Sequence, residues 1–153
     1  MKTGKHRKLN ILLLIFYSGS EASLMCIAFC GSRVHAASVV IHEEVDTPEE
    51  VEKVIKKLKN CNLPEEKSFA FMFACIGRGC GHFNGSENVE SSAFKKYFPK
   101  TPLFGFFGNG EVGFDHLYKY EESSSSNDKP SSPHIMPKMY HAYTTIICMV
   151  SIT

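Results

Sequence analysis

Two kinds of hydrophobic repeat alternate along the chain, one typical of strands and the other of helices. Leu24–Phe29 and Val34–Ile41 are apolar runs, partly β-branched, with Cys30-Gly31-Ser32-Arg33 between them. Apolar runs on either side of a short glycine-containing stretch are typical of a β-hairpin. We therefore expect these two strands to pair with each other.

A helix is expected soon after this pair of strands. Thr47 is a suitable N-cap, Pro48 occupies the first helical position, and Glu50 completes a capping box. The apolar residues that follow recur at the spacing of one helical face: Val51, Val54, Ile55 and Leu58. The surrounding Glu and Lys side chains are interpreted as a solvated outer face, because acidic residues precede basic ones as the helix dipole favours.

Ser68–Ile76 has the pattern of a strand in the middle of a sheet. Three phenylalanines alternate along one of its faces, and smaller apolar residues occupy the other. A strand with two apolar faces is typically covered on both. A glycine-rich loop over Ile76–Ser86 follows, and then a second helix is predicted over about Glu87–Phe98.

Three further strands complete the pattern. Thr101–Phe107 leads into Gly108-Asn109-Gly110 and returns through Glu111–Phe114, which predicts a second hairpin because Asn-Gly favours a tight turn. Met139–Ile152 is the predicted closing strand. We therefore expect an α+β fold with a single mixed, largely antiparallel sheet, in the order ββαβαβββ, packed against two helices.

Length and composition fit one domain and exclude several classes of protein. The chain has 153 residues, 43% hydrophobic and 22% charged, and its 17 basic and 16 acidic side chains give a formal charge of +1. This balance lacks the strongly basic face of a protein that binds nucleic acid. Apolar runs such as Ile11–Tyr17 are much shorter than the ~20 residues that span a bilayer, so we expect no membrane partner.

Two segments differ from the expected domain over residues 23–153. Residues 1–22 are an atypical leader, in which basic residues precede the apolar stretch Leu9–Tyr17 and the small residues Ser18-Gly19-Ser20. This pattern is similar to a secretory signal peptide, and Asn84-Gly85-Ser86 is a glycosylation sequon. The alternatives are a strand or an unusual chain start, and a chance tripeptide. Residues 120–138, rich in Ser and Pro, predict a disordered surface insertion.

The six cysteines lack the regular spacing of a disulfide scaffold. Four of them lie within apolar runs, where a reduced thiol acts as a small hydrophobic side chain, so we expect a reducing compartment. Structural zinc is an alternative, through Cys75, Cys80 and His82, but no second ligand pair follows. We expect neither a metal nor another cofactor.

The turn after the central strand has the first candidate site, Cys75-Ile76-Gly77-Arg78-Gly79. Its glycines allow backbone N–H groups to converge and Arg78 adds a cation, a combination that can hold a carboxylate or phosphate. Spacing alone favours the alternative, a tight turn whose arginine pairs with a carboxylate elsewhere in the fold. A reactive Cys75 thiol, with His82 or His141 as its base, is a third hypothesis, although the sequence fixes neither histidine relative to Cys75.

Two other stretches have candidate binding residues. Pro102–Gly113 has four glycines among bulky apolar residues, which implies close backbone approach and a tight turn around Asn109. Glu111 is its only acidic residue, and it either faces the same cleft as Arg78 or is solvated at a strand edge. His141 leads a polar set into the last strand, where a lone histidine is more often structural than a ligand.

Taken together, these stretches resemble the C-terminal domain of the FIST family (F-box and intracellular signal transduction). The resemblance rests on the following motifs: Phe71–Gly79, Asn88–Glu90, Ala93-Phe94, Leu103–Gly113 and His141-x-Tyr143-Thr144. It is strong over about residues 68–113, looser over 24–60, and it resumes at 140–150. A run of this length with these glycines is specific.

The resemblance implies a non-catalytic recognition module. Bacterial members are regarded as sensory domains for small ligands, whereas the eukaryotic relative is the substrate-binding subunit of an SCF-type ubiquitin ligase, in which an F-box recruits Skp1 and cullin. It therefore implies a protein substrate, a role in ubiquitin-dependent degradation, and a place in cytoplasm and nucleus, with secretion as the alternative. No F-box or N-terminal FIST half precedes the domain, so we expect docking onto Skp1 only where an F-box is supplied elsewhere.

The residues expected to bind a substrate or ligand come from the same motifs: Cys75, Gly77, Arg78, Gly79, Phe106, Asn109, Glu111 and His141. No catalytic residue and no metal ligand is expected among them. The alternative function is a sensory domain that binds a small anionic metabolite at the Gly-Arg-Gly turn.

Overall fold

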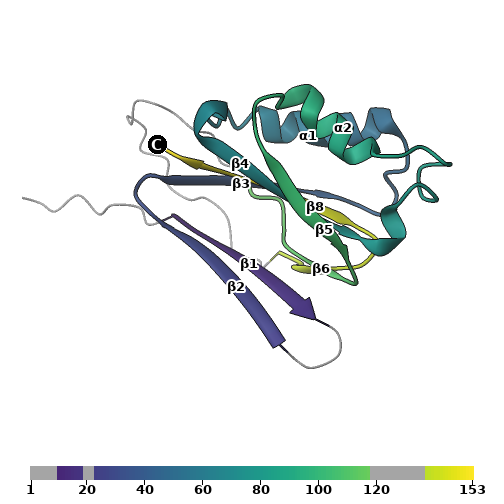
Figure 1. The fold of residues 1–153 in the computed structure, drawn as a ribbon, viewed down its shortest axis with the longest axis horizontal. Helices are drawn as coiled ribbons and strands as arrows, with labels where there is room; N and C mark the ends of the chain where they lie inside the picture. The colour runs from purple at the N-terminus through teal and green to yellow at the C-terminus, as the bar shows by residue number, and fades with distance from the viewer. Residues whose placement is uncertain (1–9, 19–22, 118–136) are drawn as a thin grey trace, which may run out of the picture.

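The computed structural model describes residues 10–18, 23–117 and 137–153. Two helices cover one face of a four-stranded sheet, and two two-stranded sheets accompany it (Figure 1). The elements in chain order are β1 (Asn10–Ser18), β2 (Ser23–Gly31), β3 (Val34–Ile41), α1 (Pro48–Lys59), β4 (Ser68–Cys75), α2 (Val89–Tyr97), β5 (Leu103–Gly108), β6 (Glu111–Val112), β7 (Tyr140–His141) and β8 (Thr145–Ile152), with short 3₁₀ helices at Glu65–Lys67 and Ile76–Arg78.

The four-stranded sheet has the order β3-β8-β4-β5. β8 lies antiparallel to both of its neighbours, whereas β5 lies parallel to β4 because the α2 crossover returns the chain in the same direction. The α+β class, with a mixed and largely antiparallel sheet and two helices, is confirmed. β4 lies between β8 and β5, as expected for a strand that is apolar on both faces.

The predicted pairing of Leu24–Phe29 with Val34–Ile41 is wrong. β2 pairs with β1 over nine residues, from Asn10↔Gly31 to Ser18↔Ser23, and β3 pairs with β8. The reason is competition between partners. The apolar strand at the end of the chain forms an eight-residue ladder with β3, from Val34↔Ile152 to Ile41↔Thr145, which the local pattern around residue 31 could not indicate.

The hairpin predicted at Gly108–Gly110 is also wrong. β6 pairs with β7, through Glu111↔His141, rather than with β5. Of the two turn residues, only Gly110 has a positive φ, 88°, whereas the tightest hairpin turn needs positive φ at both. The predicted strand Met139–Ile152 is divided into β7 and β8, because Tyr143 adopts a left-handed φ of 59° that interrupts the extended backbone.

The two helices follow the sequence closely. In α1 the Thr47 hydroxyl accepts a hydrogen bond from the Glu50 N–H at 3.4 Å, and Pro48 is the first helical residue, so the predicted cap is confirmed. α2 begins at Val89 rather than at Glu87, because Asn88 has a left-handed φ of 56° and cannot belong to the helix.

The main core lies between the helices and the sheet. Its buried members from α1 are Val51, Val54, Ile55 and Leu58, and the sheet contributes Ala37, Val39, Ile41, Ala70, Ile147 and Met149. Phe94 and Phe98, from the α2 region, stack at 4.8 Å and close the core. Ala70 of β4 belongs to this core, so the face of β4 that has the smaller residues is the one that faces the helices.

The opposite face of the sheet has a row of aromatic side chains. Phe69, Phe71 and Phe73 follow β4, with neighbouring ring centroids 5.6 and 5.9 Å apart. Phe104 and Phe106 of β5 extend the row, at 6.4 Å from Phe71 and 5.2 Å from Phe73 respectively. All three β4 phenylalanines are only partly buried, so this face is less covered than the helical one.

The leader and the insertion lie mostly outside the described residues. Of residues 1–22, the structure describes 10–18, which form strand β1, the alternative considered for this segment. Of the expected insertion over 120–138, only residues 137 and 138 are described. Within the described ranges, no helix is long and apolar enough to cross a membrane.

Candidate protein-recognition site

Four segments distant in sequence meet at one end of the sheet. Thr145, at the start of β8, lies opposite both Ile41 at the end of β3 and Ala74 near the end of β4. β5 ends beside β4, with Gly108 opposite Cys75. The loops that follow β3, β4 and β5, and the segment that precedes β8, therefore share this end of the sheet.

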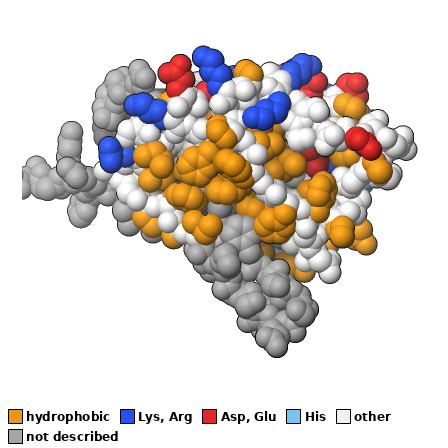
Figure 2. Space-filling view, in the orientation of Figure 1, with side chains coloured by type: hydrophobic (Ala, Val, Ile, Leu, Met, Phe, Trp, Pro, Cys, Tyr) orange, Lys and Arg blue, Asp and Glu red, His pale blue; other side chains and the backbone are white. Residues whose placement is uncertain are grey.

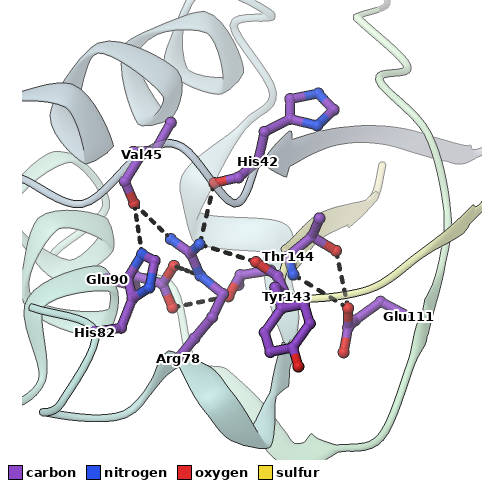
Figure 3. Close-up of polar contacts among 9 residues, drawn as sticks. His42, Val45, Arg78, His82, Glu90, Glu111, Tyr143 and Thr144 are labelled. Atoms are coloured by element: carbon purple, nitrogen blue, oxygen red, sulfur yellow. Dashed lines mark hydrogen bonds and ion pairs between the residues drawn. The ribbon is translucent and has the colours of Figure 1, made fainter.

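Arg78 ties these loops together from inside (Figure 3). Its side chain is buried, with 2% of the residue exposed, and its Nε atom donates to Glu90 Oε1 at 2.9 Å. Its terminal nitrogens donate to three backbone carbonyl oxygens, those of His42 at 3.0 Å, Tyr143 at 3.1 Å and Val45 at 3.0 Å. One guanidinium thus fixes the loop after β3, the first turn of α2 and the segment before β8.

The carboxylate of Glu90 is held equally firmly. Its second oxygen accepts a hydrogen bond from the Thr145 hydroxyl at 2.8 Å, and the Phe83 ring lies 5.4 Å from the Arg78 guanidinium carbon. Burial raises the pKa of Glu90 above its ordinary value, against the opposing effects of the Arg78 charge and the hydrogen bond from Thr145. The interpretation that spacing favoured, a tight turn whose arginine pairs with a carboxylate elsewhere in the fold, is confirmed.

Glu111 forms a second buried polar contact next to the first. Its residue is 3% exposed, and its Oε2 accepts from the Thr144 N–H at 3.2 Å and from the Thr144 hydroxyl at 2.9 Å. Its Oε1 has no hydrogen-bond partner among the described residues. Arg78 and Glu111 therefore hydrogen-bond to adjacent residues, Tyr143 and Thr144 respectively. Both side chains are buried, so Glu111 neither faces an open cleft with Arg78 nor is solvated at a strand edge, and both expectations for it are wrong.

The predicted glycines and His141 lie within the same group of loops. An added Cβ at Gly77 would lie 3.1 Å from the Tyr143 ring, whereas one at Gly79 would meet no atom within 4 Å. His141 is buried, and its Nε2 donates to the Gly113 carbonyl oxygen at 3.0 Å. These residues shape and hold the loops, while their part in ligand binding stays a prediction.

Cys75 is buried at the end of β4, and its backbone N–H donates to the Thr144 carbonyl oxygen at 2.9 Å. The two candidate bases have their Nε2 atoms engaged by backbone carbonyl oxygens, His82 by Val45 at 2.9 Å and His141 by Gly113. Among the described residues, no three His, Cys, Asp or Glu side chains are grouped to hold a metal ion, so the zinc alternative through Cys80 has no geometric support.

The same end of the sheet, and β5 itself, expose large apolar side chains. We define the recognition surface as the six that are 50–72% exposed here: Ile76, Phe104, Phe106, Phe107, Tyr140 and Tyr143. Figure 2 shows hydrophobic side chains gathered across the middle of this face, with Lys and Arg side chains along its upper and left borders. Of the predicted site residues, Gly77, Phe106 and Asn109 are exposed.

Sequence reasoning missed most of this surface. A strand was predicted over Thr101–Phe107, but nothing in the sequence indicated that this strand would lie at the sheet edge with both faces accessible. Tyr143 was assigned to the closing strand, whereas its left-handed backbone turns it out over Gly77.

A pocket adjoins the recognition surface on the helical side of β5. It has a volume of about 300 Å³ and lies between β5, the loop after β4 and the first turn of α2. Its apolar lining comes from Met72, Phe83, Val89 and Phe107, and Cys80 and Asn88 contribute to its wall. Its size suits an apolar side chain of a bound molecule.

The chain is similar in sequence to a known domain family and to several known proteins. The FIST C domain model matches residues 21–114. F-box only protein 22 from Homo sapiens is 37% identical over 128 residues, which are 81% of this chain and 30% of that protein, and the Pongo abelii protein is 36% identical over the same share. An F-box/LRR-repeat protein from Arabidopsis thaliana is 30% identical over 93 residues, 60% of this chain and 16% of that protein.

This chain spans about a third of the length of the F-box relatives that it matches. The family match includes β2 to β6 and so contains the Arg78 loop, its partner Glu90 and strand β5. Because the FIST C model matches more than half of the chain, the protein belongs to the FIST C domain family.

Proposed function

We propose that this chain is a non-catalytic protein-recognition domain of the ubiquitin-ligase adaptor type, which holds a protein substrate for ubiquitin-dependent degradation. The observation that carries the proposal is the recognition surface, six large apolar side chains exposed around β5 and the adjoining loops. Its relatives are F-box proteins by name, which supports this class of function. Skp1 and cullin join the assembly where an F-box is supplied, in the cytoplasm and nucleus.

The chemistry of the surface suits a protein partner. Contiguous exposed apolar residues are uncommon on soluble domains that bind nothing, and aromatic side chains dominate the energetics of protein interfaces. Five of the six residues of the recognition surface are Phe or Tyr. Burial of such side chains against a partner supplies most of the favourable free energy of association.

The arrangement of Arg78 favours this proposal over a sensor for small anions. Four of its N–H groups already donate to protein oxygens, and Glu90 neutralises its charge. An anion at this guanidinium would displace a buried carboxylate or a backbone carbonyl, and each lost hydrogen bond would oppose binding. The cation acts on function by shaping the loops that display the recognition surface.

Affinity capture with point variants tests the proposal. The full chain and its Tyr143→Ser variant would serve as baits, with Ile152→Lys as the matched control, because Ile152 is also an exposed apolar residue but lies at the opposite end of β8. We expect mass spectrometry to identify proteins that the control retains and Tyr143→Ser loses. These proteins should become ubiquitinated in a reconstituted SCF reaction when an F-box is fused to the chain.

Two results would count against the proposal. Identical sets of captured proteins for all three baits would show that the recognition surface binds nothing specific. Capture of Skp1 by the chain without a fused F-box would contradict the requirement for an F-box.

A further inference from the structure

β5 is the outer strand of the four-stranded sheet, and within the described ranges β4 is the one strand paired with it. The Ala70 N–H donates to the Pro102 carbonyl oxygen at 2.8 Å, and Ala70 lies opposite Leu103. In a parallel ladder with this register, alternate residues bond to the neighbour and the residues between them point their N–H and C=O groups the other way. The backbone groups of Leu103, Gly105 and Phe107 therefore point away from the sheet.

Among the residues that the structure describes, this edge has none of the devices that usually protect an outer strand. Natural edge strands are shielded by charged side chains, proline, bulges or a covering segment. β5 has the sequence Leu-Phe-Gly-Phe-Phe-Gly, without charge or proline. All six of its residues are at least partly exposed, with phenylalanine on both faces. Such an edge pairs readily with a further strand.

The two sides of the edge offer different sites for alternate side chains. Phe104 and Phe106 lie on the open face of the sheet, where they continue the aromatic row of β4. Phe107 lies on the helical side and lines the pocket of about 300 Å³. A strand added to β5 would place its side chains alternately beside the aromatic row and beside this pocket.

Charge distinguishes the two ends of the edge. Lys95 Nζ donates to the Thr101 carbonyl oxygen at 2.7 Å, just before β5 begins, and Lys67 and Lys100 are exposed near the same end. Lys100 lies 3.7 Å from Glu66, whereas Lys67 and Lys95 have no ion-pair partner within the described residues. At the other end, Gly108-Asn109-Gly110 has no charge. Acidic side chains would therefore be favoured only at the Thr101 end.

From these observations we infer that the outer edge of β5 binds an extended segment of the partner protein as an additional strand of the sheet. The segment is apolar at alternate positions and has acidic residues at the end beside Thr101. The inference rests on the proposed function and specifies the kind of substrate segment that the recognition surface takes. Backbone hydrogen bonds give the affinity in this mode, and the pocket and the aromatic row give the specificity.

Two synthetic peptides would serve as probes, Glu-Glu-Thr-Val-Thr-Val-Thr-Val and its reverse, because the partner strand can run in either direction. We expect one of them to bind the full chain and to slow hydrogen exchange of the Gly105 and Phe107 amides at least about tenfold at saturation. Two further versions of the binding peptide would each be N-methylated at every second amide, one at the odd and the other at the even positions. Because N-methylation removes the N–H donor, each version blocks hydrogen bonds along one edge of the peptide. One version should bind at least tenfold more weakly, and the other should bind as the parent does.

Several outcomes would overturn the inference. The first is failure of both peptides at 1 mM, and the second is equal effects of the two N-methylated versions, since these would show binding through side chains alone. The third is a dimer of the chain, seen by sedimentation, whose Gly105 and Phe107 amides are already protected, because a second copy would then occupy the edge. If protein capture is lost with Tyr143→Ser but retained with Phe104→Lys, the inference about the β5 edge is wrong, whereas the proposed function still stands.

Discussion

The Arg78 cluster, formed by Arg78, Glu90 and Glu111, and the outer edge of β5 reverse the usual distribution of polar and apolar residues. Arg78, Glu90 and Glu111 are charged or acidic and buried, whereas Phe104 and Phe106 are aromatic and at least half exposed. Burial of a charge is unfavourable unless it is paired, and the Arg78–Glu90 pair meets this condition. Exposure of aromatic rings needs a different explanation, and the one we propose is binding of a partner protein.

This contrast assigns different roles to the two regions: the Arg78 cluster maintains the shape of the loops, and the β5 edge is the part that we propose binds a partner. The cluster holds the loops at one end of the sheet in one arrangement, and the edge with its adjoining loops presents the apolar surface. Substitutions in the cluster should therefore act on folding, and substitutions on the edge should act on binding. The predictions below test this division, from the largest expected effect to the smallest.

Arg78→Ala should have the largest effect on stability. It removes the partner of a buried carboxylate and the donors to three backbone carbonyl oxygens. Loss of one member of a buried ion pair costs about 3–5 kcal/mol, so we expect a decrease of this size in the free energy of unfolding, or failure to fold. Urea denaturation measures it, with Arg33→Ala as the exposed control. A decrease below about 1 kcal/mol would show that the cluster does not hold the loops.

Gly105→Ala should be the most damaging of the small changes in β5. An added Cβ would lie 1.8 Å from the Met72 carbonyl oxygen, so the two strands would have to separate. Such overpacking costs about 1–3 kcal/mol. Gly79→Ala is the matched control, because a Cβ there meets nothing within 4 Å, and we expect it to change the unfolding free energy by about 0.5 kcal/mol or less. Equal effects of the two substitutions would contradict the close approach of β5 to β4.

The Glu90 carboxyl should make stability depend on pH in a defined direction. Burial raises its pKa in the folded state, so its contribution to stability is present below its ordinary pKa and is lost as pH rises through the folded pKa. Glu90→Gln removes this titration. The unfolding free energy of the wild type, relative to the variant, should therefore fall as pH rises above the ordinary glutamate value. A relative increase over that range would mean that the Arg78 charge outweighs burial.

Phe104→Lys should change stability least. The Phe104 ring is 58% exposed and lies 6.4 Å from the Phe71 ring, so little buried surface is lost. We expect the unfolding free energy to change by about 0.5 kcal/mol or less, as for most surface substitutions. A decrease above about 2 kcal/mol in urea denaturation would show that Phe104 belongs to the core rather than to an accessible edge.

Local signals in the sequence predicted the elements better than their partners. Thr47, Pro48 and Glu50 identified the start of α1 because a helix cap is encoded within four residues. The pairing of β3 with β8 joins residues more than 100 positions apart, and no local pattern indicates it. The turn at Asn109-Gly110 had the composition of a hairpin, but β7 rather than β5 pairs with β6.

The candidate site divides in the same way. The Gly-Arg-Gly turn was identifiable from its composition, and a distant carboxylate was the favoured partner for Arg78. The sequence does not identify this partner as Glu90, because that depends on how β3, α2 and β8 converge. The same convergence brings three backbone carbonyl oxygens to the guanidinium. The exposure of Phe104 and Tyr143 depends on sheet order and on one left-handed residue, neither of which the alternation of apolar residues encodes.

The most direct test of the division between shape and recognition is the affinity of Phe104→Lys for a partner protein identified by capture. Wild type and variant would be compared by titration calorimetry under conditions where urea denaturation shows both to be folded. The account predicts an affinity at least tenfold lower for the variant, with the unfolding free energy essentially unchanged. An unchanged affinity would contradict it.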